Sequence, residues 1–204
     1  EIGQGADTVF SQMAAETLHM DISRVHIVTQ QDTDVTPFDT GAYASRQTYV
    51  SGLACKQCAT ELRHRILDYA AYMLNHDVTD LSKTVYADLV KESAGKLREA
   101  LGLHPEDEVK EDMLDIVDSK IVVHGGDPVL FDVAVVADTA FYSLDKSIHL
   151  TAEVTNQCLD NTFSSGCCFV DVEVDMPLGL VTVKDIINVH DSGILINPKT
   201  AEAQ

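Results

Sequence analysis

The feature that most constrains the fold is an unbroken helical pattern that runs from Ser45 to about His76. Apolar side chains recur along it at intervals of three and four residues, so they fall on one face of an α-helix. The sequence therefore predicts a long amphipathic helix with one buried face. The residues expected on that face are Leu53, Leu62, Ile66, Tyr69, Ala70, Met73 and Leu74.

Shorter periodic segments accompany this helix. Helical spacing predicts further helices at residues 7–20, 85–101 and 129–142, and Gly102 is placed to cap the second of them. Alternation of apolar and polar residues predicts single strands at 25–30 and 148–154.

Two hairpins are also predicted. The first joins residues 113–117 to 120–123 through the two-residue turn Asp118-Ser119. The second joins residues 168–175 to 180–190 around Pro177-Leu178-Gly179. In this second hairpin the alternation points Val170, Val172 and Val174 inward and Asp171, Glu173 and Asp175 outward.

These elements predict an α+β fold in which helices pack on one face of a mixed or antiparallel sheet. A length of 204 residues suits one sizeable domain, and we expect a single domain over residues 1–204. Residues 77–112 read as an insertion into it.

Charge and cysteine content exclude several classes of protein. The chain carries 33 acidic and 14 basic residues, a net charge of −19, which argues against nucleic acid or an anionic membrane as a partner. No stretch of 18 apolar residues is present that would span a membrane. Five cysteines do not resemble a disulfide framework and favour a reducing cytoplasm. The missing initial Met and the end at Gln204 lead us to expect a piece of a longer polypeptide.

The segment before the long helix has the character of a ligand-binding loop. Pro37 and Gly41 predict a turn, and the small residues that follow, Ala42 to Ser45, would let a backbone approach a ligand. A helix start favours an anion, and the planar fork of Arg46 suits phosphate oxygens. The alternative is an ordinary turn in which Arg46 pairs with a nearby carboxylate such as Asp39.

A second loop of this kind opens the chain. Gly3-Gln4-Gly5 precedes the first predicted helix, so its backbone N–H groups lie at a helix start and the Gln4 amide can donate and accept. The alternative is a glycine-rich helix entry without a ligand.

Two other patterns invite a chemical interpretation. Cys55 and Cys58 form a CxxC inside the long helix, without the strand, tight loop or second pair that redox or zinc chemistry requires, so we expect reduced, metal-free thiols. His190-Asp191-Ser192 contains the residue types of a hydrolase triad, but a triad is assembled in space and neighbours on a strand end point in different directions.

Three blocks of sequence resemble the molybdenum hydroxylases, the family of xanthine dehydrogenases and aldehyde oxidases, and within it the molybdenum-binding subunits of bacterial xanthine dehydrogenases. The blocks occur in the family's order and span the chain. They are residues 1–8, residues 37–47, and residues 188–193 together with Asn197-Pro198 and 201–204.

The resemblance implies a molybdenum-dependent hydroxylase that oxidises a purine, another N-heterocycle or an aldehyde with oxygen from water. It implies a molybdopterin cofactor, in the cytosine dinucleotide form, and FAD and 2Fe-2S centres on partner subunits or domains of a larger homo-oligomeric assembly. The residues implied to bind the cofactor are Gln4, Gly5, Ala42, Tyr43, Ala44, Ser45, Arg46, Gln47, Asp191, Ser192, Asn197 and Gln204.

No catalytic residue and no metal-ligating side chain is assigned in this chain. In the family the metal is held by the pterin, the catalytic Glu comes from far downstream and substrate-binding residues come largely from upstream, so the chain alone is expected to be inactive. Two alternatives stay open: a cofactor-free assembly module, and a hydrolase that uses His190 or Ser192.

Overall fold

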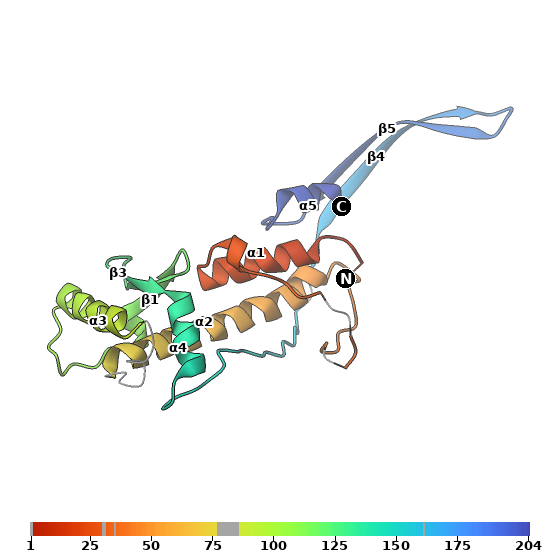
Figure 1. Ribbon diagram of the computed structural model, residues 1–204. Helices are drawn as coiled ribbons and strands as arrows, with labels where there is room; N and C mark the ends of the chain where they lie inside the picture. Colours follow the sequence, from red (N-terminus) through yellow and green to blue (C-terminus); the bar gives the residue numbers. More distant parts are fainter. Residues whose placement is uncertain (1, 30–31, 35, 77–85, 161) are drawn as a thin grey trace. The chain divides into compact units, whose positions relative to one another are not determined.

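A computed structural model describes residues 2–29, 32–34, 36–76, 86–160 and 162–204. The chain forms two compact units, Glu1–Gln157 and Cys158–Gln204 (Figure 1). Helices and small antiparallel sheets together make an α+β fold, as predicted. The single domain over residues 1–204 stays a prediction.

The long helix is the centre of the first unit. A π-helical turn, η2 (Gln47–Ser51), leads directly into α2 (Gly52–Asn75), which confirms the helical pattern. Its apolar face is deepest in the second half, while Leu53 and Leu62 are only partly buried. The buried residues of that half are Ile66, Leu67, Tyr69, Ala70, Ala71, Met73 and Leu74.

A three-stranded antiparallel sheet packs against the second half of α2. It consists of β1 (Leu114–Val117), β2 (Lys120–Val123) and β3 (Val129–Asp132), in that order. The predicted turn joins β1 to β2, and its residues Asp118 and Ser119 have φ of 47° and 66°, the positive values that a two-residue hairpin turn favours.

Three more helices complete this unit, α1 (Ala6–Leu18), α3 (Ala87–Leu101) and α4 (Val133–Tyr142), beside the short turns η1 (Ile22–Arg24) and η4 (Glu111–Met113). Figure 1 shows α1 beside the first half of α2, with the sheet, α3 and α4 gathered at the second half. Helix α3 buries Val90 and Leu97 in the same core as α2 and ends at Gly102, as predicted.

The predicted insertion therefore contributes to the core through α3. Residues 77–85 of that segment lie outside the described residues. Whether residues 77–112 are an insertion relative to the family stays a prediction.

Three predicted elements differ from the structure. Residues 25–29 and 148–154 form no strand in the described chain, and Gln30 lies outside it. Alternation alone is not sufficient for a strand, because the backbone groups also need a neighbouring strand to pair with. Residues 129–132, predicted to begin a helix, instead form β3, which pairs with β2. Helix α4 begins only at Val133, where the Asp132 side chain accepts a hydrogen bond from the Ala134 N–H.

The second unit contains the longer predicted hairpin. Strands β4 (Ser165–Asp175) and β5 (Leu180–Asp191) pair antiparallel, with a bulge after Asp171, and the short helix α5 (Pro198–Ala203) follows. The hairpin itself is confirmed. Its predicted inward face is not buried, because every residue of β4 and β5 is exposed within the described chain.

The register still places the apolar residues together. Residues that lie directly opposite one another share a face, so the cross-strand pairs of valines and Ile186 form one apolar face along the hairpin. We call these residues the valine face. They are Val170, Val172, Val174, Val181, Val183 and Ile186.

Candidate functional site

The first candidate loop lies at the start of α1. Gly3 and Gly5 have φ of 89° and 92°, a region that glycine adopts without strain, and Gly5 caps the helix without a side-chain hydrogen bond. The Gln4 side-chain oxygen accepts a hydrogen bond from the Ile2 N–H at 2.8 Å.

The nitrogen of the same Gln4 side chain is buried and has no hydrogen-bond partner among the described residues. A buried donor without an acceptor costs free energy, so such an atom marks a place where a ligand acceptor would be stabilised. A Cβ built on the neighbouring Gly3 would meet nothing within 4 Å, so there is open space beside this loop.

The second candidate loop precedes η2. Gly41 has a φ of 106°, and Ala44 and Ser45 have φ of 50° and 56°, which is uncommon for residues other than glycine. Such conformations carry strain and cluster at ligand-binding sites. The side chains of Tyr43 and Ser45 are exposed.

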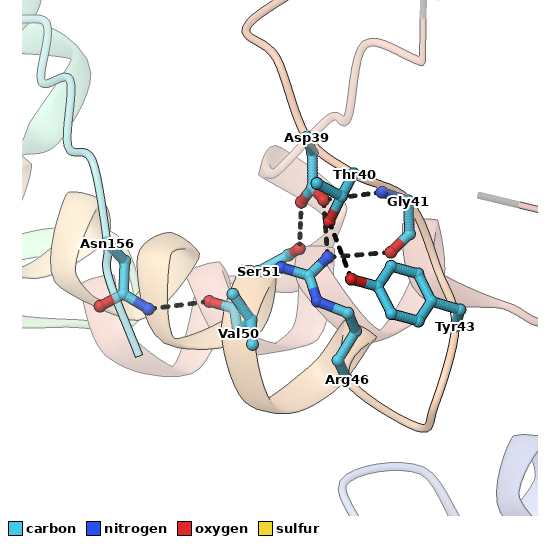
Figure 2. Close-up of polar contacts among 8 residues, drawn as sticks. All are labelled: Asp39, Thr40, Gly41, Tyr43, Arg46, Val50, Ser51 and Asn156. Carbon is cyan, nitrogen blue, oxygen red and sulfur yellow. Dashed lines mark hydrogen bonds and ion pairs between the residues drawn. The ribbon is translucent and has the colours of Figure 1, made fainter. Parts of the chain in front are cut away.

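A polar network fixes the base of this loop (Figure 2). Arg46 Nη1 donates to Asp39 Oδ1 at 2.6 Å and to the Gly41 carbonyl oxygen at 2.8 Å. Asp39 also accepts hydrogen bonds from the Gly41 N–H at 2.9 Å and from the Ser51 hydroxyl at 3.0 Å. The Gly41 N–H, followed by Arg46 and Ser51, holds the pKa of Asp39 below its usual range.

The structure therefore shows the pair with Asp39 that was left open as the alternative for Arg46. The guanidinium also lies over the Tyr43 ring, 5.4 Å from its centroid. A direct contact from Arg46 to a phosphate stays a prediction.

Helix packing brings the two loops to one end of the first unit. The Cys55 thiol reaches the Phe10 carbonyl at 3.6 Å, so the early turns of α1 and α2 lie side by side. Further along, His19 binds the Ile116 carbonyl and Arg63 pairs with Asp115, so both helices run toward β1. Because α1 and α2 run in the same direction, the loops that precede them lie at the same end of the pair (Figure 1).

The remaining predicted site residues belong to the second unit. Asp191 accepts a hydrogen bond from the Gly193 N–H at 3.1 Å, and the Asn197 side chain caps α5 by accepting from the N–H groups of Lys199 and Thr200. Ser192 and Gln204 are exposed. Their grouping with Gln4, Gly5 and residues 42–47 stays a prediction.

The hydrolase alternative gains no support from this geometry. The His190 ring lies across the hairpin from Gly166, where an added Cβ would come within 2.7 Å of its Nδ1. Among the described residues, no hydrogen bond joins the side chains of His190, Asp191 and Ser192, whereas a nucleophile and its base need one.

The CxxC cysteines face backbone carbonyls. Cys55 lies at the Phe10 carbonyl, and Cys58 donates to the Ala152 carbonyl at 3.1 Å. Burial raises the pKa of the Cys55 thiol, which disfavours the reactive thiolate. All five cysteines are free. In the described part of the chain, no group of three or more His, Cys, Asp and Glu side chains is arranged to hold a metal ion.

The sequence indicated Asp39 only as the alternative partner of Arg46, and it did not place Ser51 and Asn156 at the site. Asn156 donates to the Val50 carbonyl at 3.1 Å and so ties a distant loop to η2 (Figure 2). One local signal was available for Asp39: an Asp two residues before a Gly often accepts that residue's N–H in an Asx turn. The contacts to Ser51 and Asn156 depend on the fold and carry no local signal.

Comparison with known proteins gives a consistent result. A family model described as molybdopterin cofactor-binding domain matches residues 1–204. The chain is 39% identical over 204 residues to the putative xanthine dehydrogenase molybdenum-binding subunit of Escherichia coli K12, covering all of this chain and 23% of that protein. It is 46% identical over 81 residues to a probable hypoxanthine oxidase of the same organism, covering 40% of this chain and 8% of that protein.

Solved structures share the fold. Quinoline 2-oxidoreductase from Pseudomonas putida 86 matches with a TM-score of 0.69 and 24% identity, over all of this chain and 22% of that one. A Cu,Mo carbon monoxide dehydrogenase matches with a TM-score of 0.67 and 21% identity over the same share of each chain. The chain thus spans less than a quarter of the length of these relatives. No described helix has the length and apolarity needed to cross a membrane.

Proposed function

The chain belongs to the molybdopterin cofactor-binding domain family, and from this premise we propose that it supplies two of the loops that hold a molybdenum-bound pterin. The whole protein would then be a molybdenum-dependent hydroxylase of the xanthine dehydrogenase type. Its substrate would be a purine, another N-heterocycle or an aldehyde, with water as the source of oxygen.

The observation that carries this proposal is the buried Gln4 nitrogen without a partner, at the start of α1. The open space at Gly3 and the strained residues Ala44 and Ser45 at the same end of the helix pair support it. When bound, the cofactor supplies the redox chemistry of such hydroxylases. The residues of this chain bind and orient it.

The side chains of the two loops suit cofactor binding because they offer hydrogen-bond donors, not because of the net charge of the chain. Gln4 offers an unused N–H donor, and Ser45 offers an exposed hydroxyl at a helix start. Gly5, Ala42, Tyr43, Ala44, Arg46 and Gln47 complete the two loops. Asp191, Ser192, Asn197 and Gln204 join them in this proposal on the strength of the matching sequence block.

The finer features of the assembly are also proposals. The cofactor would be the cytosine dinucleotide form, and FAD and 2Fe-2S centres on partner subunits or domains would carry electrons away within a homo-oligomeric assembly. Free cysteines throughout support a reducing, cytoplasmic setting.

The test uses the full-length protein that contains this chain. Gln4→Ala removes a donor worth about 0.5–1.5 kcal/mol, so the affinity for the pterin should fall by roughly 2- to 12-fold. Molybdenum is measured by elemental analysis and pterin by fluorescence after oxidative release. Gln57→Ala, on an exposed position of α2, removes the same side chain away from the loops and should leave both contents unchanged.

A wild-type protein that contains neither molybdenum nor pterin would contradict the proposal and favour the cofactor-free assembly module. Equal cofactor contents in wild type and Gln4→Ala would remove Gln4 from the site.

A further inference from the structure

We propose that Asp39 and Arg46 are positioning residues that act as one unit, holding residues 42–45 in the shape that receives the cofactor, and that Arg46 is not itself a phosphate ligand. This inference rests on the proposed function. It assigns a role to Asp39, and it replaces the simpler expectation that the Arg46 guanidinium binds the cofactor directly.

The contacts of the pair close the loop on itself (Figure 2). Arg46 Nη1 binds Asp39 on one side of residues 42–45 and the Gly41 carbonyl beside it, at 2.6 and 2.8 Å. The second Asp39 oxygen accepts from Ser51 at 3.0 Å, which fastens the loop to the last residue of η2. A single carboxylate thus connects the entry to the loop, its exit and the helix that follows.

The backbone inside this closure is strained. Ala44 and Ser45 both have positive φ, at 50° and 56°. Residues in this region persist only where the surrounding structure determines them. The described contacts that span residues 42–45 include the Asp39–Arg46 pair, the bonds from Arg46 to the Gly41 carbonyl and from Ser51 to Asp39, and the Arg46 N–H bond to the Tyr43 carbonyl at 3.1 Å. The guanidinium also lies over the Tyr43 ring. All of these contacts involve Asp39 or Arg46. Loss of the pair therefore releases the strained segment.

Electrostatics argues against a direct phosphate contact. The Asp39 carboxylate lies 2.6 Å from the guanidinium, so the pair has no net charge. The carboxylate beside the guanidinium repels an approaching phosphate and so offsets the attraction of the positive fork, in a chain whose net charge is −19. The pair is suited to fixing geometry and gives little attraction to an anion.

The two roles make opposite predictions for Asp39. If Arg46 binds phosphate directly, Asp39→Ala frees the guanidinium and removes a negative charge, so cofactor content stays the same or rises. If the pair positions the loop, Asp39→Ala lowers cofactor content by the same factor as Arg46→Ala. The double variant is then no worse than either single one, because both changes break one unit.

The experiment compares Asp39→Ala, Arg46→Ala and the double variant in the full-length protein. We expect molybdenum and pterin contents about 3- to 10-fold below wild type in all three, which corresponds to about 0.6–1.4 kcal/mol of lost binding free energy. Arg46→Lys, which keeps the charge and loses the fork, should be intermediate. Glu92→Ala breaks a 2.8 Å ion pair with Lys96 on α3 and serves as the matched control, with unchanged content.

A second readout does not require bound cofactor. In protein purified without cofactor, hydrogen exchange of peptides covering residues 39–51 should be faster in Asp39→Ala and Arg46→Ala than in wild type and Glu92→Ala. Unchanged exchange would overturn the positioning role. Because this readout needs no bound pterin, a failure of the positioning role can be distinguished from a failure of the proposed cofactor-binding function. Full cofactor content in Asp39→Ala would overturn it as well.

Discussion

At the scale of single residues, Asp132 has two separable functions. Its two oxygens pair with both terminal nitrogens of Arg24 at 2.8 Å, and one of them also caps α4 at the Ala134 N–H. Asp132→Asn removes the ion pair and keeps a capping group, and we expect a loss of less than about 1 kcal/mol because both side chains are partly exposed. Asp132→Ala also loses the cap, a further cost of about 0.5–2 kcal/mol in urea unfolding at pH 7.

The same residue predicts a dependence on pH. Arg24 holds the pKa of Asp132 below its usual range in the folded protein. A lowered carboxyl pKa contributes stability above the unfolded value of about 3.9, and that stability is lost as the pH falls through the folded pKa. The difference in unfolding free energy between wild type and Asp132→Asn should therefore shrink below about pH 4. A difference that stays constant from pH 7 to the acid limit of folding would contradict this.

In the candidate site, local sequence predicts some residue conformations but does not settle the contacts that the folded loop makes. Gly5 at the start of α1 follows from local sequence, because the conformation depends on neighbouring residues. The pair of Arg46 with Asp39 was expected only as the alternative to a phosphate contact, since sequence alone does not decide whether Arg46 meets Asp39, the Gly41 carbonyl or a ligand. Only the folded loop shows which acceptor lies within reach.

At the scale of elements, Gly52 sets how closely α1 and α2 pack. A Cβ at Gly52 would lie 3.1 Å from the Met13 thioether. We expect Gly52→Leu to cost about 1–3 kcal/mol through overpacking and to move α1, and with it the Gln4 loop. Thermal unfolding and the cofactor content of the full-length protein measure the two effects.

The matched control is Gly95→Ala on α3, where an added Cβ meets nothing within 4 Å. A helix gains about 1 kcal/mol when an exposed interior Gly becomes Ala, so this variant should be more stable than wild type. If Gly52→Leu unfolds like wild type and retains its cofactor, the close packing of α1 on α2 does not position the loop.

Elements were predictable where the signal was local. The 118–119 turn and the β4–β5 hairpin were found because turn residues and alternation fix them. The strands expected at 25–30 and 148–154 were wrong because pairing depends on a neighbour that sequence alone does not supply. Val129–Asp132 was predicted to be helical because a short apolar run fits both the helical and the strand periodicity. In the structure these residues form a strand because they pair with β2.

At the scale of the whole molecule, the valine face and the net charge act against each other. The valine face leaves Val172 and Val183 46% and 52% exposed, which favours self-association of this chain when it is produced alone. The net charge of −19 opposes it, and salt screens that repulsion over about 10 Å at 0.1 M. Sedimentation velocity should therefore show association that increases with salt.

Val172→Lys should reduce this association, whereas Thr182→Lys adds the same charge on the other face of the hairpin and should not. Thr182 lies opposite Glu173 in the register, so it belongs to the other face of the hairpin, which carries Asp171, Glu173, Asp175 and Asp185 and which we call the acidic face. Equal effects of the two lysines would assign the association to net charge instead of to the valine face.

The acidic face of this hairpin has a consequence for biosynthesis. At about 5–20 residues per second, a ribosome synthesises residues 165–191 within seconds. The emerging hairpin then exposes a run of valines and two strand edges whose backbone groups are unpaired. Asp171 lies directly opposite Asp185 on the acidic face, an arrangement that weakens the pairing of the strands. During those seconds the same repulsion disfavours stacking of one nascent copy on another, so the two aspartates act as gatekeepers that trade hairpin stability for solubility of the emerging chain.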